Sequence, residues 1–245
     1  MTFRVPLIGS WLVAVCVTAL VAACPVEAQI IGNPVRTLRP NEWSAGLSSE
    51  LMDVSLGSGS DKGDFRSYRG LSKIAFGVSE QLTVSLVLGL ANLEIDNPGG
   101  GSEAEFKGGF RLAHGYQALL DIADYGDWTL FSGAGLVSIR SNGEYDQIIL
   151  DTVNSYSAKM QWTEYSLVQG LRYNHPKWTM YGGIEELDIR HKEKITGDNY
   201  KSGFQVHYFA GCDINMSRTF CFNIQVKSGR ATTVSVGLSE RTMGF

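Results

Sequence analysis

Several features that define common protein classes are scarce in this sequence. Lysine and arginine together number 21 against 25 acidic residues, for a formal net charge of −4. The chain therefore lacks the basic excess that binding to nucleic acid requires. After the N-terminal stretch, no apolar run reaches the roughly 18 residues of a transmembrane helix. Charged residues make up only 19%, whereas aromatic residues reach 11% and glycine 28 positions. This composition favours short, half-apolar strands joined by turns.

Motifs that carry chemistry are equally scarce. The sequence has no phosphate-binding loop, nucleophile elbow or metal-ligand spacing. Asp121, Asp124 and Asp127 lie close together but lack the pattern of a calcium loop, so we interpret them as a solvated turn. The histidines are scattered along the chain, at His114, His175, His191 and His207. We expect no cofactor, no bound metal and no enzymatic activity.

The first residues have the pattern of a secretory signal peptide. Arg4 is followed by an apolar stretch, and Val26-Glu27-Ala28 is an acceptable cleavage site before Gln29. A second site precedes Cys24 and would make the protein a lipoprotein. We predict a signal peptide over 1–28, a periplasmic segment over 29–41 and one β-barrel domain over 42–245.

Alternation with a period of two residues is the main structural signal. From Leu82 to Leu90, every second residue is leucine or valine, and the residues between them are mostly small or polar. In a soluble β-sandwich the large apolar face would form a core. In an outer-membrane barrel it would face lipid, while small and polar residues line the lumen. Alternation alone does not separate these two folds.

The polar face favours the barrel, because several strands carry charges in the middle of that face. Buried charges are costly unless they are paired, and these residues are of both signs. We therefore predict a lumen filled by mutually neutralising side chains, at Glu50, Arg69, Lys73, Lys107, Arg111, Glu164, Arg172, Glu185 and His207.

The lengths of the connections also favour a barrel. Short turns at 79–81 and 174–176 alternate with longer polar segments at 57–63 and 97–101, as in barrels that have both termini in the periplasm. We predict an all-β fold, a transmembrane antiparallel up-and-down barrel of about ten strands, with eight as the alternative. The expected strands are 42–55, 66–78, 82–94, 104–117, 127–140, 156–173, 177–189, 201–213, 219–227 and 230–240.

Three segments resemble strands of bacterial outer-membrane β-barrel proteins. They are Gln161-Trp162-Thr163-Glu164-Tyr165-Ser166, Tyr181-Gly182-Gly183-Ile184 and Thr232-Thr233-Val234-Ser235-Val236-Gly237-Leu238. The resemblance is to the small OmpA/OmpX-like barrels that lack a periplasmic domain. It implies a place in the outer membrane, contact with its lipid and lipopolysaccharide, and insertion by the barrel-assembly machinery.

Two cysteines remain after the predicted signal peptide, Cys212 and Cys221. They flank a short turn in an oxidising compartment, where a disulfide is chemically possible. The alternation pattern places them on opposite faces of their strands, whereas a cross-strand bridge needs side chains on one face. A bulge near the turn would remove the conflict, so both states stay open.

We expect a structural or surface-binding role without enzymatic activity. The outer loops near 57–65, 95–103, 141–155 and 190–200 would bind an extracellular ligand. Within 141–155 the apolar contact candidates are Tyr145, Ile148, Ile149 and Leu150.

Three alternatives remain at this stage. The first is a narrow passive or gated pore for small solutes or ions. The second is a soluble periplasmic β-sandwich or lipoprotein. The third is a hydrolase at the rim of the barrel, where Asp188 would hold His191 as a general base beside Glu144 and Asp146.

Overall fold

The computed structural model describes residues 37–56, 63–96, 104–149, 152–193, 199–229 and 231–242. These residues form ten β-strands. No helix within these ranges has the length and apolar character needed to cross a membrane. The strands are β1 (Trp43–Leu56), β2 (Gly63–Gly77), β3 (Leu82–Asp96), β4 (Ala104–Tyr125), β5 (Trp128–Ile149), β6 (Thr152–Asn174), β7 (Trp178–Glu193), β8 (Asn199–Asn215), β9 (Phe220–Ser228) and β10 (Ala231–Thr242).

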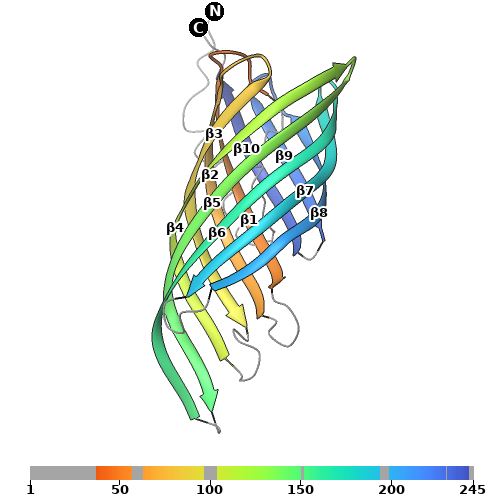
Figure 1. The fold of residues 1–245 in the computed structure, drawn as a ribbon. Helices are drawn as coiled ribbons and strands as arrows, with labels where there is room; N and C mark the ends of the chain where they lie inside the picture. Colours follow the sequence, from red (N-terminus) through yellow and green to blue (C-terminus); the bar gives the residue numbers. More distant parts are fainter. Residues whose placement is uncertain are drawn as a thin grey trace, which may run out of the picture.

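The strands close into a single antiparallel barrel in sequence order (Figure 1). Closure is made by β1 and β10, which pair from Trp43 with Thr242 to Val54 with Ala231. The predicted up-and-down barrel is confirmed, with ten strands rather than eight. Because the sheet closes on itself, a two-sheet β-sandwich is excluded.

The connections between strands differ in length between the two ends of the barrel. Four tight connections, at 78–81, 126–127, 175–177 and 216–219, lie at one end, called the turn end below. The barrel also begins and finishes at this end, since Trp43 pairs with Thr242. At the opposite end, called the hairpin end, β1 connects to β2, β3 to β4, β5 to β6, β7 to β8 and β9 to β10. The expected strands 104–117 and 127–140 imply a long connection at 118–126. This connection is wrong, because β4 continues to Tyr125 and only a two-residue turn at 126–127 follows.

The alternation of side chains gives the barrel an apolar outer band. On β3, Thr83, Ser85 and Val87 are buried, whereas Val84, Leu86 and Leu88 are exposed. Large apolar side chains elsewhere on the outer surface include Ile74, Phe76, Phe110, Leu112, Leu167, Leu171, Ile184, Val206, Ile224 and Val226. A surface of this kind is stable against hydrocarbon and unfavourable in water.

A short segment before β1 enters the turn end of the barrel. Leu38 is only 1% exposed, and its backbone N–H donates to Thr83 Oγ1 over 2.8 Å. The Arg39 carbonyl lies so close to Gly77 that a Cβ at Gly77 would overlap it. The end of the predicted periplasmic segment 29–41 is thus tied to the barrel interior, while residues 29–36 lie outside the described residues.

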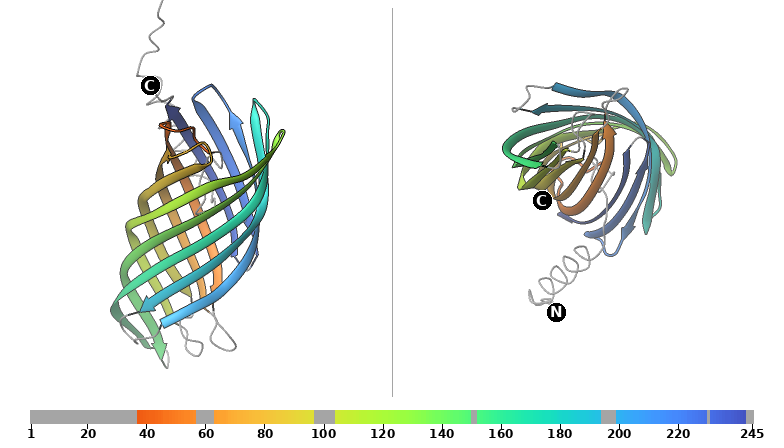
Figure 2. Two further views of the ribbon diagram at one scale, coloured as in Figure 1. Left: turned by 45° about the horizontal axis from the view of Figure 1, so that its top comes forward. Right: turned by 90° about the horizontal axis from the view of Figure 1, so that it is seen from below.

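The β5–β6 pair extends beyond the described part of β7 (Figure 1), whereas β4 accompanies β5 as far as Gln147. The two strands pair without interruption from Trp128 with Tyr173 to Ile149 with Thr152. The predicted irregular loop at 141–155 is therefore mostly a β-hairpin. Figure 2 shows from two further directions how steeply the strands are tilted around the barrel.

Candidate functional site: the barrel interior and the β5–β6 hairpin

The structure places seven of the nine predicted lumen residues on inward faces. Six are buried and one, Lys73, is half-buried. They come from five strands, β1, β2, β6, β7 and β8. The residues are Glu50, Arg69, Lys73, Glu164, Arg172, Glu185 and His207.

Lys107 and Arg111 are the two exceptions, and their predicted lumen position is wrong. Both are exposed on the outer surface of β4. The β4–β5 register shifts between Gly108 and Ala113, so the inward positions are even before the shift and odd after it. A bulge adds a residue and reverses the alternation, which a sequence pattern cannot locate. Lys107 Nζ instead donates a hydrogen bond to Glu105 Oε2 over 2.7 Å.

Arg69 and Glu164 form the central ion pair of the interior. Arg69 Nη1 donates to Glu164 Oε2 over 3.0 Å, and Nη2 contacts the second carboxylate oxygen. Arg69 Nε donates to Ser67 Oγ over 3.1 Å. The Trp162 indole N–H donates to Glu164 as well, with an N–O distance of 2.5 Å. Both charges are thus removed from water and held by several partners.

Two further ion pairs lie within the barrel. Lys227 contacts Glu185, and both side chains are at most 4% exposed. Arg172 contacts Asp121 near the turn end, and the Thr37 hydroxyl also contacts Asp121. Asp121 is 6% exposed, so its interpretation as part of a solvated turn is wrong. The continuation of β4 to Tyr125 turns Asp121 inward; Asp124 and Asp127 are exposed.

A further polar network occupies the neighbouring part of the interior. Asn223 Nδ2 donates to the Tyr181 hydroxyl over 2.6 Å and also contacts Asp213. The Tyr181 hydroxyl donates to Gln225 Oε1 over 3.1 Å. These residues and Lys227 were not predicted from the sequence. Their inward parity in β7, β8 and β9 was the signal that would have identified them.

Towards the hairpin end the interior becomes apolar. Phe65 and Trp162 pack with their ring centroids 5.1 Å apart. Around them lies a cluster of buried residues that includes Val54, Leu93, Ile95, Phe106, Ile139, Ala158, Met160, Leu187 and Ile189. Only charged side chains were predicted in the lumen, so this apolar cluster was not expected from the sequence.

The outer surface of the β5–β6 hairpin has the opposite character. Asn142, Glu144, Ser157 and Lys159 are exposed there, while Ala158 faces the interior with 0% exposure. This arrangement, polar outside and apolar inside, is that of a protein in water. The apolar outer band therefore stops before this part of the hairpin.

The four predicted contact residues fall at or beside the hairpin tip. Tyr145, Ile148 and Ile149 belong to β5, but their side chains lie outside the described part of the structure, as does Leu150 entirely. Among the described tip residues, Val153 is 58% exposed and Tyr156 is 49% exposed. The structure thus places two further apolar side chains in the predicted contact region.

The residues proposed for a rim hydrolase are only partly described. Asp188 is 8% exposed and accepts a hydrogen bond from Arg190 Nε over 3.0 Å. The backbone of His191 pairs with that of Trp162, but the His191 side chain lies outside the described residues. No group of three or more histidine, cysteine or acidic side chains within the described ranges is placed to hold a metal ion.

Cys212 and Cys221 do not form a disulfide with each other. Across the β8–β9 pair, Cys212 is opposite Ile224 and Cys221 is opposite Asn215. Asp213 and Asn223 are buried, which places Cys221 on the inward face and Cys212 on the outward face. Continuous pairing near the turn leaves the two thiols on opposite faces of the sheet.

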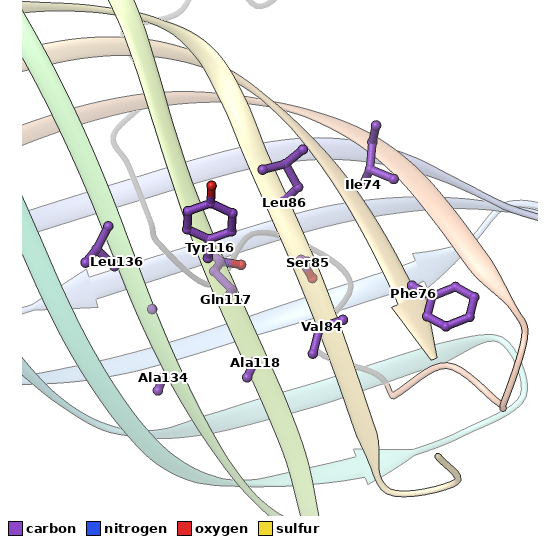
Figure 3. Close-up of a pocket in the computed structure, with 11 residues that line it drawn as sticks. Ile74, Phe76, Val84, Ser85, Leu86, Tyr116, Gln117, Ala118, Ala134 and Leu136 are labelled. Carbon is purple, nitrogen blue, oxygen red and sulfur yellow. The ribbon is translucent and has the colours of Figure 1, made fainter. Parts of the chain in front are cut away.

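An apolar groove of about 740 Å³ lies on the outer band over β2 to β5. Ala118 and Ala134 are opposite each other in the register, and their small side chains leave the hollow. Figure 3 shows Tyr116 and Leu136 standing beside them, with Val84, Leu86, Ile74 and Phe76 on the adjoining strands. The groove opens outward, and its lining also includes the polar residues Ser85 and Gln117.

Comparisons with known proteins identify the fold but no sequence family. No family profile matches the chain, and no curated protein matches it at a significant level. The β-domain of a Bordetella autotransporter, BrkA, aligns at a TM-score of 0.50 and 15% identity over 83% of this chain and 98% of that one.

Two further solved barrels align at similar levels. The translocator domain of the autotransporter NalP from Neisseria meningitidis has a TM-score of 0.48 and 10% identity over 96% of both chains. The outer-membrane protease OmpT from Escherichia coli has a TM-score of 0.45 and 11% identity over 85% of this chain and 100% of that one. The chain has the fold of a bacterial outer-membrane β-barrel.

Proposed function

We propose that this protein resides in the outer membrane and acts as a surface-binding protein without enzymatic activity, through the β5–β6 hairpin. The observation that carries the proposal is the change of polarity along this hairpin. Within the band, outward residues such as Leu167 and Leu171 are apolar. Beyond it, Asn142, Glu144 and Lys159 face outward. A β-structure that is polar outside and apolar inside is suited to an aqueous phase and not to hydrocarbon.

The orientation follows from the connections. Outer-membrane barrels have short periplasmic turns and longer extracellular elements. The turn end would therefore face the periplasm and the hairpin end the exterior. Lipid and lipopolysaccharide would cover the outer band, including the groove over Ala118 and Ala134, after insertion by the barrel-assembly machinery.

The filling of the interior supports binding over transport. A ten-stranded barrel is only slightly wider than an eight-stranded one, whose lumen side chains fill it. Arg69 and Glu164 join non-adjacent strands across the interior, and Phe106, Trp162 and Ile189 add bulk closer to the hairpin end. A solute would have to displace paired charges and packed apolar groups to pass.

Surface labelling tests the orientation. In a background with Cys212→Ser and Cys221→Ser, we would compare Ser155→Cys on the hairpin with Ser217→Cys on the β8–β9 turn. Both serines are exposed. A membrane-impermeant maleimide should label the first on intact cells and the second only after lysis. Labelling of the second alone on intact cells would reverse the topology and refute the proposed function.

Conductance of the purified protein in a planar bilayer distinguishes a surface-binding protein from a pore. The purified protein, folded in detergent and shown to shift on a gel on boiling, should give no steady steps in a planar bilayer. Reproducible, ion-selective steps would instead support transport as the role of the barrel.

A further inference from the structure

The distal part of β6 has one strand neighbour among the described residues. From Thr152 to Lys159 it pairs with β5. Its described pairing with β7 begins only at Met160, opposite Glu193. Among the described residues, none pairs with the other edge of residues 152–159, whose backbone amides and carbonyls thus have no described strand partner.

This edge lacks the features by which proteins usually block strand addition. Such features include prolines, bulges and several charges. Residues 152–159 contain no proline, and their only charge is Lys159 at the base. The pairing of β6 with β5 runs through this stretch without a register shift. The edge is thus regular enough to accept a further strand.

The exposed side chains of this stretch also favour a strand partner. Val153 and Tyr156 are 58% and 49% exposed and have opposite parity, so they lie on the two faces of the strand. β-Branched and aromatic residues form the most favourable cross-strand pairs. A strand added beside β6 would cover both of these side chains.

The surroundings restrict what the occupant can be. Ser155, Ser157 and Lys159 are exposed around the edge, which places it in water beyond the apolar band, so lipid chains are excluded. A second copy in the same membrane would be related by a two-fold axis along the membrane normal. That symmetry pairs two strands antiparallel only if they lie flat on the membrane, whereas the hairpin runs away from the barrel along its length (Figure 1).

We propose that the β6 edge over residues 152–159 binds an extended segment of another protein outside the cell by adding it as a strand to the β5–β6 hairpin. Backbone hydrogen bonds would supply the affinity, and contacts with Val153 and Tyr156 would supply selectivity. This inference rests on the proposed function, because it requires the hairpin to face the exterior.

The test uses a synthetic peptide with the sequence Ser141–Ile149, which is the strand that β6 already accepts on its other edge. Fluorescence anisotropy of the labelled peptide with the full, detergent-folded protein gives the affinity. Two further peptides carry N-methyl groups on alternate residues, one set for each edge of the peptide. Since only one edge would face β6, one N-methylated peptide should bind at least about tenfold more weakly and the other should bind like the parent.

Two protein variants complete the test. Consecutive residues of a strand direct their N–H groups to opposite edges. Ser155→Pro and Tyr156→Pro therefore each remove the N–H donor on a different edge of β6. One variant should keep the folded, heat-modifiable barrel and lose the peptide; loss of folding in the other is the expected result of breaking the bond to β5. No binding up to about 1 mM peptide, or equal binding of both N-methylated peptides, overturns the proposal.

The labelling at Ser155→Cys separates the two possible failures. A hairpin that is labelled on intact cells but does not bind the peptide would refute strand addition and leave the proposed function standing. If intact cells are labelled in the Ser217→Cys variant but not in the Ser155→Cys variant, the proposed function itself is refuted.

Discussion

Arg69 of β2 and Glu164 of β6 are 95 residues apart in the sequence and form a two-point ion pair inside the barrel. Their strands are not neighbours in the sheet, so the pair links separate parts of the wall through the interior. Each side chain is only 1% exposed. Such a pair is costly to form, and removal of one partner leaves a buried charge without compensation.

Replacement of Glu164 by glutamine should destabilise the barrel strongly. The change leaves the Arg69 guanidinium buried without the carboxylate that it contacts, and we expect a loss of about 3–5 kcal/mol in the free energy of unfolding. The double variant Arg69→Met/Glu164→Leu should be much closer to wild type because it removes both charges together. Urea unfolding in detergent, followed by gel mobility, measures both. A loss in the double variant as large as in the single one would contradict this account.

Gly183→Ala should disturb the pairing of β6 with β7. A Cβ at Gly183 would overlap the Gln169 carbonyl oxygen and lie 2.6 Å from Gly170 Cα, both backbone atoms. Overpacking of this kind costs about 1–3 kcal/mol, since the backbone must shift. Gly70→Ala is the matched control, because a Cβ there meets nothing within 4 Å. The midpoint of thermal unfolding should fall for the first variant only.

Leu38→Ala should destabilise the barrel from its turn end. Leu38 is fully buried, and truncation of a buried leucine costs about 2–5 kcal/mol. Arg39→Ala serves as the control, as the Arg39 side chain is exposed. Equal unfolding midpoints for Leu38→Ala and wild type would show that the segment before β1 does not contribute to stability.

Mass spectrometry should find two reactive thiols in the mature chain. Cys212 and Cys221 point to opposite faces of the sheet and are not bonded to each other. Denaturation in iodoacetamide without reductant should therefore add two carbamidomethyl groups to the protein made in an oxidising compartment. If the carbamidomethyl groups were added only after reduction, a Cys212–Cys221 disulfide would be present, and the β8–β9 register near the turn would differ from the one described.

The number of strands and the inward and outward faces of β3 could be predicted from the sequence. The alternation from Leu82 to Leu90 matches the observed faces of β3. It works because the two sides of a transmembrane strand face different media, so each residue type is selected at every second position. The composition and the turn signals then limit the length of each strand.

The faces of residues beyond a bulge could not be predicted from the sequence. Lys107 and Arg111 were expected in the lumen because the alternation was extended through β4 without a break. The shift between Gly108 and Ala113 reverses the faces, and its position depends on how the neighbouring strands pair. Asp121 was misplaced because the expected strand ended at residue 117, whereas β4 continues to Tyr125.

The sequence by itself determined that the chain forms a β-barrel of about ten strands with an apolar outside, since hydrocarbon and a polar lumen impose a two-residue period that is visible in any single strand. The tertiary structure alone decided which charges meet, as in Arg69 with Glu164 and Lys227 with Glu185, and which edge of β6 has no strand partner among the described residues. These contacts depend on barrel closure, register and stagger, which are properties of all ten strands together and of no single segment.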